Sequence, residues 1–319
     1  MKAARFFADL EAKPASLRAL AGVIGDQQWR AAREDRLLLV GMGSSLFAAE
    51  TIARRLRRTG IQATAELASV EASFPADPSL TVIAVTASGS SKETLEFVAA
   101  HHGTSRTIAL TNMPDVVLPA DHTMQMRAGE ELGGIACRSY SHTLAMLLQL
   151  EHQLSGTVPD LAKQLELAAD AAESLLAGRD EWLPEAREIV AGANGCWVLA
   201  PAERLANALQ GALMLREGPR LAADGCETGD WNHVDVYLTK SLDYRAVLFA
   251  GSRFDGDAVA WMRERRSKFI AVGGHMPGAT MEVRYPGEDD SIVALLTEVL
   301  ITELLAADLW LHAPEGSDV

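Results

Sequence analysis

The sequence predicts an α/β protein with two similar domains in tandem, each a parallel sheet with helices on both faces. Three observations support this prediction. Short apolar segments alternate with segments of helical periodicity, which is the pattern of βαβ units. The alternation stops at an alanine-rich helical stretch near the middle of the chain and then starts again. The chain has 319 residues, which is enough for about two ordinary domains.

The N-terminal segment, residues 1–34, is predicted to be helical. Leu17 and Leu20 lie at the spacing of one helix face. The pattern breaks at Lys13-Pro14, because proline disrupts a helix interior. We expect this segment to pack on a larger domain.

The first predicted domain covers residues 35–156. Its expected strands are 37–40, 80–85 and 107–110, and its expected helices are 46–58, a helix beginning near residue 92, and 139–153. Residues 157–190 are predicted to be linker helices, the first of them over 160–177.

The second predicted domain covers residues 191–319. Its expected strands are 196–199, 244–249 and 268–272, and its expected helices are 204–216, a helix after the loop 251–255, and a long apolar helix over 291–311. Because this order repeats that of the first half, we interpret the chain as two related domains.

The charge excludes two classes of partner. The chain has 29 basic and 43 acidic residues, a formal net charge of −14, and no run rich in Lys or Arg. Nucleic acids and anionic membrane surfaces attract positive charge. We therefore expect neither nucleic acid nor membrane as a partner.

Cysteine usage and the N-terminal residues favour a cytoplasmic protein. Cys137, Cys196 and Cys226 have no spacing typical of a zinc site or a disulfide framework. The N-terminal segment is too charged for a signal peptide, and no apolar run approaches the ~20 residues of a membrane span. We expect no metal and no cofactor.

Two loops rich in Gly and Ser follow predicted strands in the first domain, at 41–45 and 86–91. A helix that begins after such a loop presents free backbone N–H groups and partial positive charge, which favour an anion such as phosphate. Two interpretations stay open. The hydroxyl groups bind a phosphate, or they only cap the following helices.

The same loops resemble a known family. Residues 40–45 together with 86–94, Thr-Ala-Ser-Gly-Ser-Ser-Lys-Glu-Thr, are similar to the sugar-phosphate signature of the SIS (sugar isomerase) superfamily. Residues 128–141 resemble the A-G-x-E-x-G-V-A-S-T-K segment of its double-domain members, typified by the isomerase half of glucosamine-6-phosphate synthase. Residues 211–217 resemble their G-A-L-K-L-K-E segment, and His233 follows Glu217 at the family's spacing.

This resemblance implies two tandem flavodoxin-like SIS domains and a small-molecule sugar phosphate as ligand. It also implies a homodimer whose sites are shared between subunits. Glu217 would move a proton between C1 and C2 of an open-chain sugar, and His233 would assist ring opening from the other subunit. The implied substrate- and phosphate-binding residues are Gly43, Ser44, Ser45, Thr86, Ser88, Ser91 and Gly134.

The sequence departs from the family pattern at lysine positions. Met214 stands where the family has lysine, and Val234-Asp235 replace a glycine-proline pair. The pattern also continues beyond the final Gly316-Ser317-Asp318-Val319 into a tail with a catalytic lysine. These departures put lysine-assisted isomerisation in doubt.

Two classes of function follow. The first is a phosphosugar isomerase or an amino-sugar-phosphate deaminase or deglycase, with one carboxylate as the base. The alternative is a non-catalytic sugar-phosphate-binding protein, either a sensor or an inactive relative, which the missing lysines favour. The long apolar helix over 291–311 is a second reason to expect a homodimer.

Overall fold

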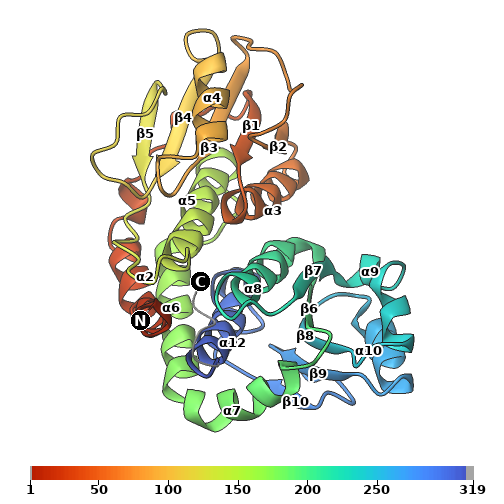
Figure 1. The fold of residues 1–319 in the computed structure, drawn as a ribbon. Coiled ribbons are helices and arrows are strands. Elements are labelled where there is room, and N and C mark those ends of the chain that lie inside the picture. The colour runs from red at the N-terminus through yellow and green to blue at the C-terminus, as the bar shows by residue number, and fades with distance from the viewer. Residues whose placement is uncertain (1, 314–319) are drawn as a thin grey trace. The chain divides into compact units, whose positions relative to one another are not determined.

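The computed structural model describes residues 2–313 (Figure 1). The chain divides into two compact units, each built on one parallel sheet. The first-sheet unit comprises Ser16–Glu130 and Arg138–Glu166, and the second-sheet unit comprises Met1–Ala15, Glu131–Cys137 and Leu167–Val319. Within the described residues, no helix is both long and apolar enough to cross a membrane.

The first sheet has five parallel strands in the order β2-β1-β3-β4-β5. They are β1 (Arg36–Gly41), β2 (Ala63–Leu67), β3 (Leu80–Val85), β4 (Arg106–Thr111) and β5 (His122–Gln125). This is the flavodoxin-like order, in which the chain leaves β1 in one direction and returns to build on its other side. The predicted parallel sheet is confirmed in this unit.

Helices of the first-sheet unit pack on its sheet and on one another. They are α2 (Lys13–Ala21), η1 (Ile24–Asp26), α3 (Ser44–Arg58), α4 (Lys92–His101), α5 (Arg138–Ser155) and the start of α6 (Leu161–Ala177). Because right-handed crossovers run in opposite directions from β1 and β3, α3 and α4 lie on opposite faces (Figure 1). Val40, Val82 and Phe97 belong to the apolar core between the sheet and α4.

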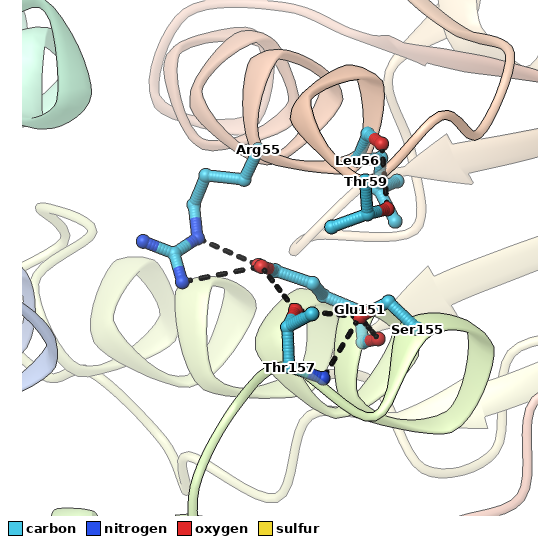
Figure 2. Close-up of polar contacts among 6 residues, drawn as sticks. All are labelled: Arg55, Leu56, Thr59, Glu151, Ser155 and Thr157. Carbon is cyan, nitrogen blue, oxygen red and sulfur yellow. Dashed lines mark hydrogen bonds and ion pairs between the residues drawn. The ribbon is translucent and has the colours of Figure 1, made fainter.

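A buried ion pair holds α3 against α5. Arg55 Nε lies 2.6 Å from Glu151 Oε2 and Arg55 Nη2 lies 3.2 Å from Glu151 Oε1, so the contact is bidentate (Figure 2). Thr157 Oγ1 also donates to Glu151 Oε1, at 3.4 Å. Since α3 is a continuous helix, this contact near its C-terminus helps to fix the direction in which its N-terminus points.

The second sheet repeats this plan. Its five parallel strands are β6 (Cys196–Ala200), β7 (Ala223–Glu227), β8 (Arg245–Phe249), β9 (Lys268–Val272) and β10 (Met281–Val283). Their order, β10-β9-β8-β6-β7, is that of the first sheet read from the other edge. The two sheets therefore share one topology.

The helices of the second-sheet unit include the first helix of the chain. They are α1 (Lys2–Glu11), α7 (Arg179–Val190), η2 (Ala202–Arg204), α8 (Leu205–Glu217), α9 (Thr228–Trp231), η3 (Asp235–Lys240), α10 (Asp255–Glu264), α11 (Ser291–Thr297) and α12 (Val299–Leu311). The predicted helical segment 1–34 is present as α1 and α2, with the break at Ala12 and with Lys13-Pro14 in the first turn of α2, and it is wrong over residues 27–34, which form no helix.

The prediction of a single helix over 291–311 is wrong in one respect. This segment forms two helices, α11 and α12, which meet at Glu298. The Ile301 N–H donates to Glu298 O, so the helical hydrogen-bond ladder tightens to a three-residue step at this point. The Glu298 side chain is buried and bonds to Asn207 and Arg204. The break therefore coincides with a buried polar contact.

Most of the apolar surface of α12 is buried inside its own unit, and only Leu311 at its end is an exposed large apolar residue. Ile301, Leu304 and Leu305 are fully buried, in one core with residues of α1, α7 and α8. The apolar surplus that suggested a dimer therefore leaves no uncovered face along these residues. The homodimer stays a prediction from the resemblance.

A short segment inside the predicted first domain packs with the second sheet. In Glu131–Cys137, the Gly133 N–H donates to Asp9 Oδ2 at 2.7 Å. A Cβ on Gly133 would lie 2.5 Å from the Phe6 Cα, so only glycine fits against α1. The compact units thus follow spatial packing and differ from continuous stretches of sequence. The predicted domain boundaries remain a proposal.

Candidate phosphate-binding site

The candidate site lies at the topological switch point of the first sheet. The strands β1 and β3 are neighbours, and their connections to α3 and α4 leave the sheet in opposite directions. In open α/β sheets, ligands bind in the crevice at the carboxyl ends of such strands. The two loops that the sequence singles out are these two connections.

Glycine shapes the β1–α3 loop. Gly43 has φ +51° and ψ −126°, a conformation that residues with a side chain rarely adopt. A Cβ on Gly41 would lie 2.8 Å from the Ser45 Cβ, so Gly41 allows the helix to start close to the strand. No side chain caps α3. The Ser45 N–H of the first turn donates to Met42 O at 3.1 Å, and no side chain caps the other N–H groups of that turn.

The β3–α4 loop supplies hydroxyl groups. Thr86 is 4% exposed, and among the described residues its Oγ1 has no hydrogen-bond partner. Ser88 is exposed, and its Oγ accepts from the Ser90 hydroxyl at 2.9 Å. An unpartnered buried hydroxyl costs roughly 1–3 kcal/mol. A ligand that accepts from Thr86 would remove that cost.

The hydroxyl groups do not cap the helices. Ser91 is the N-cap residue of α4, yet it makes no side-chain capping bond. Its Oγ instead lies 3.2 Å from Glu93 Oε2 and 3.0 Å from Thr94 Oγ1. Two uncapped helix N-termini therefore meet at one switch point, an arrangement that suits an anion. This geometry favours the phosphate interpretation of the sequence over the capping interpretation.

Gly134 belongs to a different compact unit from the serine loops. It lies in Glu131–Cys137, is exposed and has φ +74°. Its N–H donates to Glu131 O in a turn. Its substrate-binding role stays a prediction.

Glu217 is the last residue of α8 and is half-buried. Burial raises the pKa of its carboxyl group, and the guanidinium groups of Arg220 and Arg216 oppose this rise. A carboxylate with a raised pKa is better matched to accepting a proton near neutral pH.

His233 is exposed and follows α9. It lines a groove of about 770 Å³ in the second-sheet unit. Four carboxyl groups and two aromatic rings share this groove, namely those of Glu227, Asp230, Asp257, Glu264, Phe254 and Trp261. Glu217 is not among the lining residues. Within the second-sheet unit, the two predicted catalytic residues therefore do not share a groove.

Met214, at the position of a family lysine, lies in the core. It is fully buried in the cluster around α8 and α12. Gln210 Nε2 lies 3.6 Å from its sulfur and donates to Ala136 O at 3.0 Å. This position is filled by packing and provides no amine.

The switch point of the second sheet is closed by the chain itself. Asp255 Oδ2 accepts from the N–H groups of Gly251 and Ser252, at 2.7 and 3.0 Å. Arg204 pairs with Glu298 at 2.9 Å and donates to Ala250 O. This arrangement was not predicted from the sequence, although Asp255, at the start of the helix after 251–254, was a visible signal. In the part of the chain that is described, no His, Cys, Asp and Glu side chains are grouped to hold a metal ion.

The fold is that of an α/β protein with two parallel five-stranded sheets, and part of the chain matches a known family. Residues 32–152 match the family model described as SIS domain. The glutamine–fructose-6-phosphate aminotransferase (isomerizing) of Aeropyrum pernix is 29% identical over 241 residues, or 71% of this chain and 38% of that relative. The chain thus carries a SIS domain homologous to the isomerase region of these aminotransferases, and it spans well under half of their length.

Solved structures share the fold over nearly the whole chain. The tagatose-6-phosphate ketose/aldose isomerase of Escherichia coli has a TM-score of 0.77 and 17% identity, covering 99% of this chain and 95% of that one. The glucosamine-6-phosphate deaminase of Thermotoga maritima has a TM-score of 0.71 and 15% identity, covering 96% and 94%. At this identity the likeness concerns the fold alone.

Proposed function

We propose that the protein binds a phosphosugar with its phosphate between the β1–α3 and β3–α4 loops. The observation that carries this proposal is the meeting of two uncapped helix N-termini at one switch point, beside the unpartnered Thr86 hydroxyl. The proposed phosphate-binding residues are Gly43, Ser44, Ser45, Thr86, Ser88 and Ser91, with Gly134 as a further substrate contact. Backbone N–H groups and hydroxyls together provide the donors that a phosphate needs.

The proposed reaction is aldose–ketose isomerisation, or loss of an amine from a phosphorylated amino sugar or fructosamine. All of these reactions need a proton to move next to a carbonyl or imine carbon. Glu217 is the proposed base, supported by the burial that raises its pKa. His233 is the proposed group for ring opening, acting from the second subunit of a homodimer. A cytoplasmic location is part of this proposal.

A second candidate function is sugar-phosphate binding without catalysis. It is favoured by Met214, which occupies a family lysine position and is packed in the core. In that case the phosphate loops would act as a sensor for a sugar phosphate.

The test is solvent-deuterium exchange at C1 and C2 of a panel of hexose 6-phosphates, amino-sugar phosphates and fructosamine phosphates, with ammonia measured in parallel. Wild-type protein should exchange at least one member. Glu217→Gln should reduce that exchange by about 10²–10⁴-fold, the usual contribution of a general base. Binding by the variant should stay close to wild type, because Glu217 is not in the phosphate loops.

Three outcomes separate the alternatives. Tight binding by wild-type protein with no exchange on any panel member favours the sensor. Full exchange by Glu217→Gln would remove Glu217 as the base and leave the enzyme proposal standing. A panel in which no sugar phosphate binds would refute both candidate functions.

A further inference from the structure

Arg127 has an unusual backbone conformation for its place in the fold. Three non-glycine residues of the described chain have positive φ, namely Arg127 at 60°, Arg220 at 61° and Arg266 at 58°. Arg220 and Arg266 follow the ends of α8 and α10, where a left-handed residue is a common way to end a helix. Arg127 follows a strand, β5, so no helix end accounts for its conformation.

The backbone on both sides of Arg127 is held in place. The Met126 N–H donates to Thr111 O at 2.8 Å. The Ala128 N–H donates to Asn112 Oδ1 at 2.8 Å, and Asn112 Nδ2 donates to Gly129 O at 2.7 Å. A left-handed residue with a side chain costs roughly 1–2 kcal/mol. Such strain persists where the surroundings over-determine it, and it gathers at functional sites.

The guanidinium group of Arg127 forms no hydrogen bond or ion pair with another described residue. Arg127 is exposed, and no hydrogen bond or ion pair joins its side chain to another described residue. This contrasts with Arg55 and Arg204, which form buried ion pairs with Glu151 and Glu298. An exposed arginine side chain with no partner among the described residues, on a backbone that is held in place, remains available to an external anion.

Arg127 lies beside the proposed phosphate site. The Asn112 N–H donates to Ala87 O at 3.1 Å, and Ala87 stands between Thr86 and Ser88. The side chain of the same Asn112 holds Ala128 and Gly129. One residue, Asn112, therefore connects the β3–α4 loop to the segment that follows Arg127, through its backbone on one side and its side chain on the other. It lies on the β5 side of that loop, away from β1.

We propose that Arg127 recognises a carboxylate at the end of the sugar opposite its phosphate. This inference rests on the proposed function. The phosphate has its own donors between the β1 and β3 loops, so a cation two strands further along the sheet would meet the other end of the ligand. The guanidinium fork matches a carboxylate in two parallel hydrogen bonds. The substrate class is therefore a sugar phosphate that bears a carboxylate near C1.

Two sources of that carboxylate share this chemistry. One is a sugar acid phosphate, in which C1 itself is oxidised. The other is the adduct of a sugar phosphate with the amine of an amino acid, in which the carboxylate lies beyond the C1 nitrogen. The adduct is a substrate for the deglycase form of the proposed reaction.

The test is calorimetric titration of the full chain with three ligands: fructose 6-phosphate, 6-phosphogluconate and N-(1-deoxyfructosyl)glycine 6-phosphate. Wild-type protein should bind at least one carboxylated ligand roughly tenfold or more tightly than fructose 6-phosphate, the effect of one good charged hydrogen-bonded contact. The carboxylated ligand with the larger increase in affinity over fructose 6-phosphate identifies the source of the carboxylate.

The variant is Arg127→Gly, which removes the guanidinium and relieves the backbone strain, so loss of folding is not expected. It should bind the carboxylated ligand no more tightly than fructose 6-phosphate, whose affinity should stay unchanged. Arg266→Gly is the matched control, because it removes another exposed arginine with positive φ and should leave the preference intact.

Two results would overturn the role of Arg127 alone. One is equal weakening of all three ligands in Arg127→Gly, which would place the guanidinium on the phosphate. The other is a wild-type protein that binds fructose 6-phosphate but shows no preference for a carboxylate. A wild-type protein that binds none of the three ligands would instead refute the proposed phosphosugar function and this inference with it.

Discussion

The two sheets of this protein have the same strand order, but the loops at their switch points differ in whether a carboxylate of the chain accepts the loop N–H groups. In the first sheet, the loops after β1 and β3 lead into helices that no side chain caps. In the second sheet, α8 and α10 also lack a side-chain cap, but Asp255 accepts the loop N–H groups of Gly251 and Ser252. A shared topology therefore creates a potential anion site twice, and the local side chains decide whether it is open.

The second switch point is stabilised by its own charges. The Asp255 carboxylate stands where an anionic ligand could accept the same N–H groups, and burial is the main reason that its pKa is raised. Behind it, the Arg204–Glu298 pair is nearly buried, with side chains 13% and 1% exposed. The first sheet has its buried pair, Arg55 and Glu151, between α3 and α5 (Figure 2). Its crevice has the hydroxyl groups of Thr86, Ser88 and Ser91, with the Glu93 carboxylate 3.2 Å from Ser91 Oγ.

The largest expected effect comes from breaking the ion pair of the second switch point. Arg204→Met leaves the Glu298 carboxylate buried without its cation, and we expect a loss of about 3–5 kcal/mol in the free energy of unfolding. Urea denaturation of the variant and wild type measures this. Replacing both partners, as Arg204→Met with Glu298→Gln, should recover most of the loss, since no unpaired charge remains.

The pH dependence of the Arg204→Met variant follows from the same pair. Burial raises the pKa of Glu298, and Arg204 opposes this rise. Without Arg204 the folded-state pKa rises further, so the folded state binds a proton more readily than the unfolded state. Destabilisation should therefore shrink as the pH falls towards that raised pKa, and grow at higher pH. Equal destabilisation at pH 5 and pH 8 would contradict this account.

The next largest expected effect is on sugar-phosphate affinity, measured for serine variants in the loops of the two switch points. Ser88→Ala together with Ser91→Ala should weaken sugar-phosphate binding by roughly 1–3 kcal/mol, the range for hydrogen bonds to charged groups. The matched control is Ser252→Ala in the β8–α10 loop, whose N–H is already bonded to Asp255. The control should leave affinity unchanged in calorimetric titration. If the double variant binds as well as wild type, the phosphate is not held by these residues.

The smallest expected effect is the opening of the second switch point. Asp255→Ala frees the Gly251 and Ser252 N–H groups, so sulfate should bind there weakly. The gain is expected at ~0.3–1 kcal/mol, as for an anion at an exposed helix N-terminus. Thermal unfolding with sulfate, compared with chloride at equal ionic strength, measures it in the Ser88→Ala, Ser91→Ala background. No extra sulfate stabilisation over that background would show that topology and free N–H groups alone do not make an anion site.

Central strands could be predicted from the sequence, and edge strands could not. The strands β1, β3, β4, β6, β8 and β9 appear as short apolar runs because their side chains are largely buried on both faces of the sheets. The edge strand β7 reads Ala-Asp-Gly-Cys-Glu, and β5 reads His-Thr-Met-Gln. Such partly exposed segments carry no apolar signal.

The site could be predicted only in part. Glycine and serine after two apolar strands point to an anion-binding loop, because the chemistry is local to the loop. Arg127 gave no such signal, since its importance depends on a backbone angle and on the absence of a partner within the described chain. Glu217 and His233 were named from a resemblance, and their roles stay proposals.

By itself, the sequence determined where apolar strands end and where small polar loops begin, and hence that two parallel sheets form with loops at their carboxyl ends. The tertiary structure decided which distant charges stand behind the second switch point. Arg204 and Glu298 are 94 positions apart, and only folding brings them together beside β8. A contact over that separation leaves no local pattern in the sequence, whereas Asp255, which accepts the N–H groups of Gly251 and Ser252, is local to its loop.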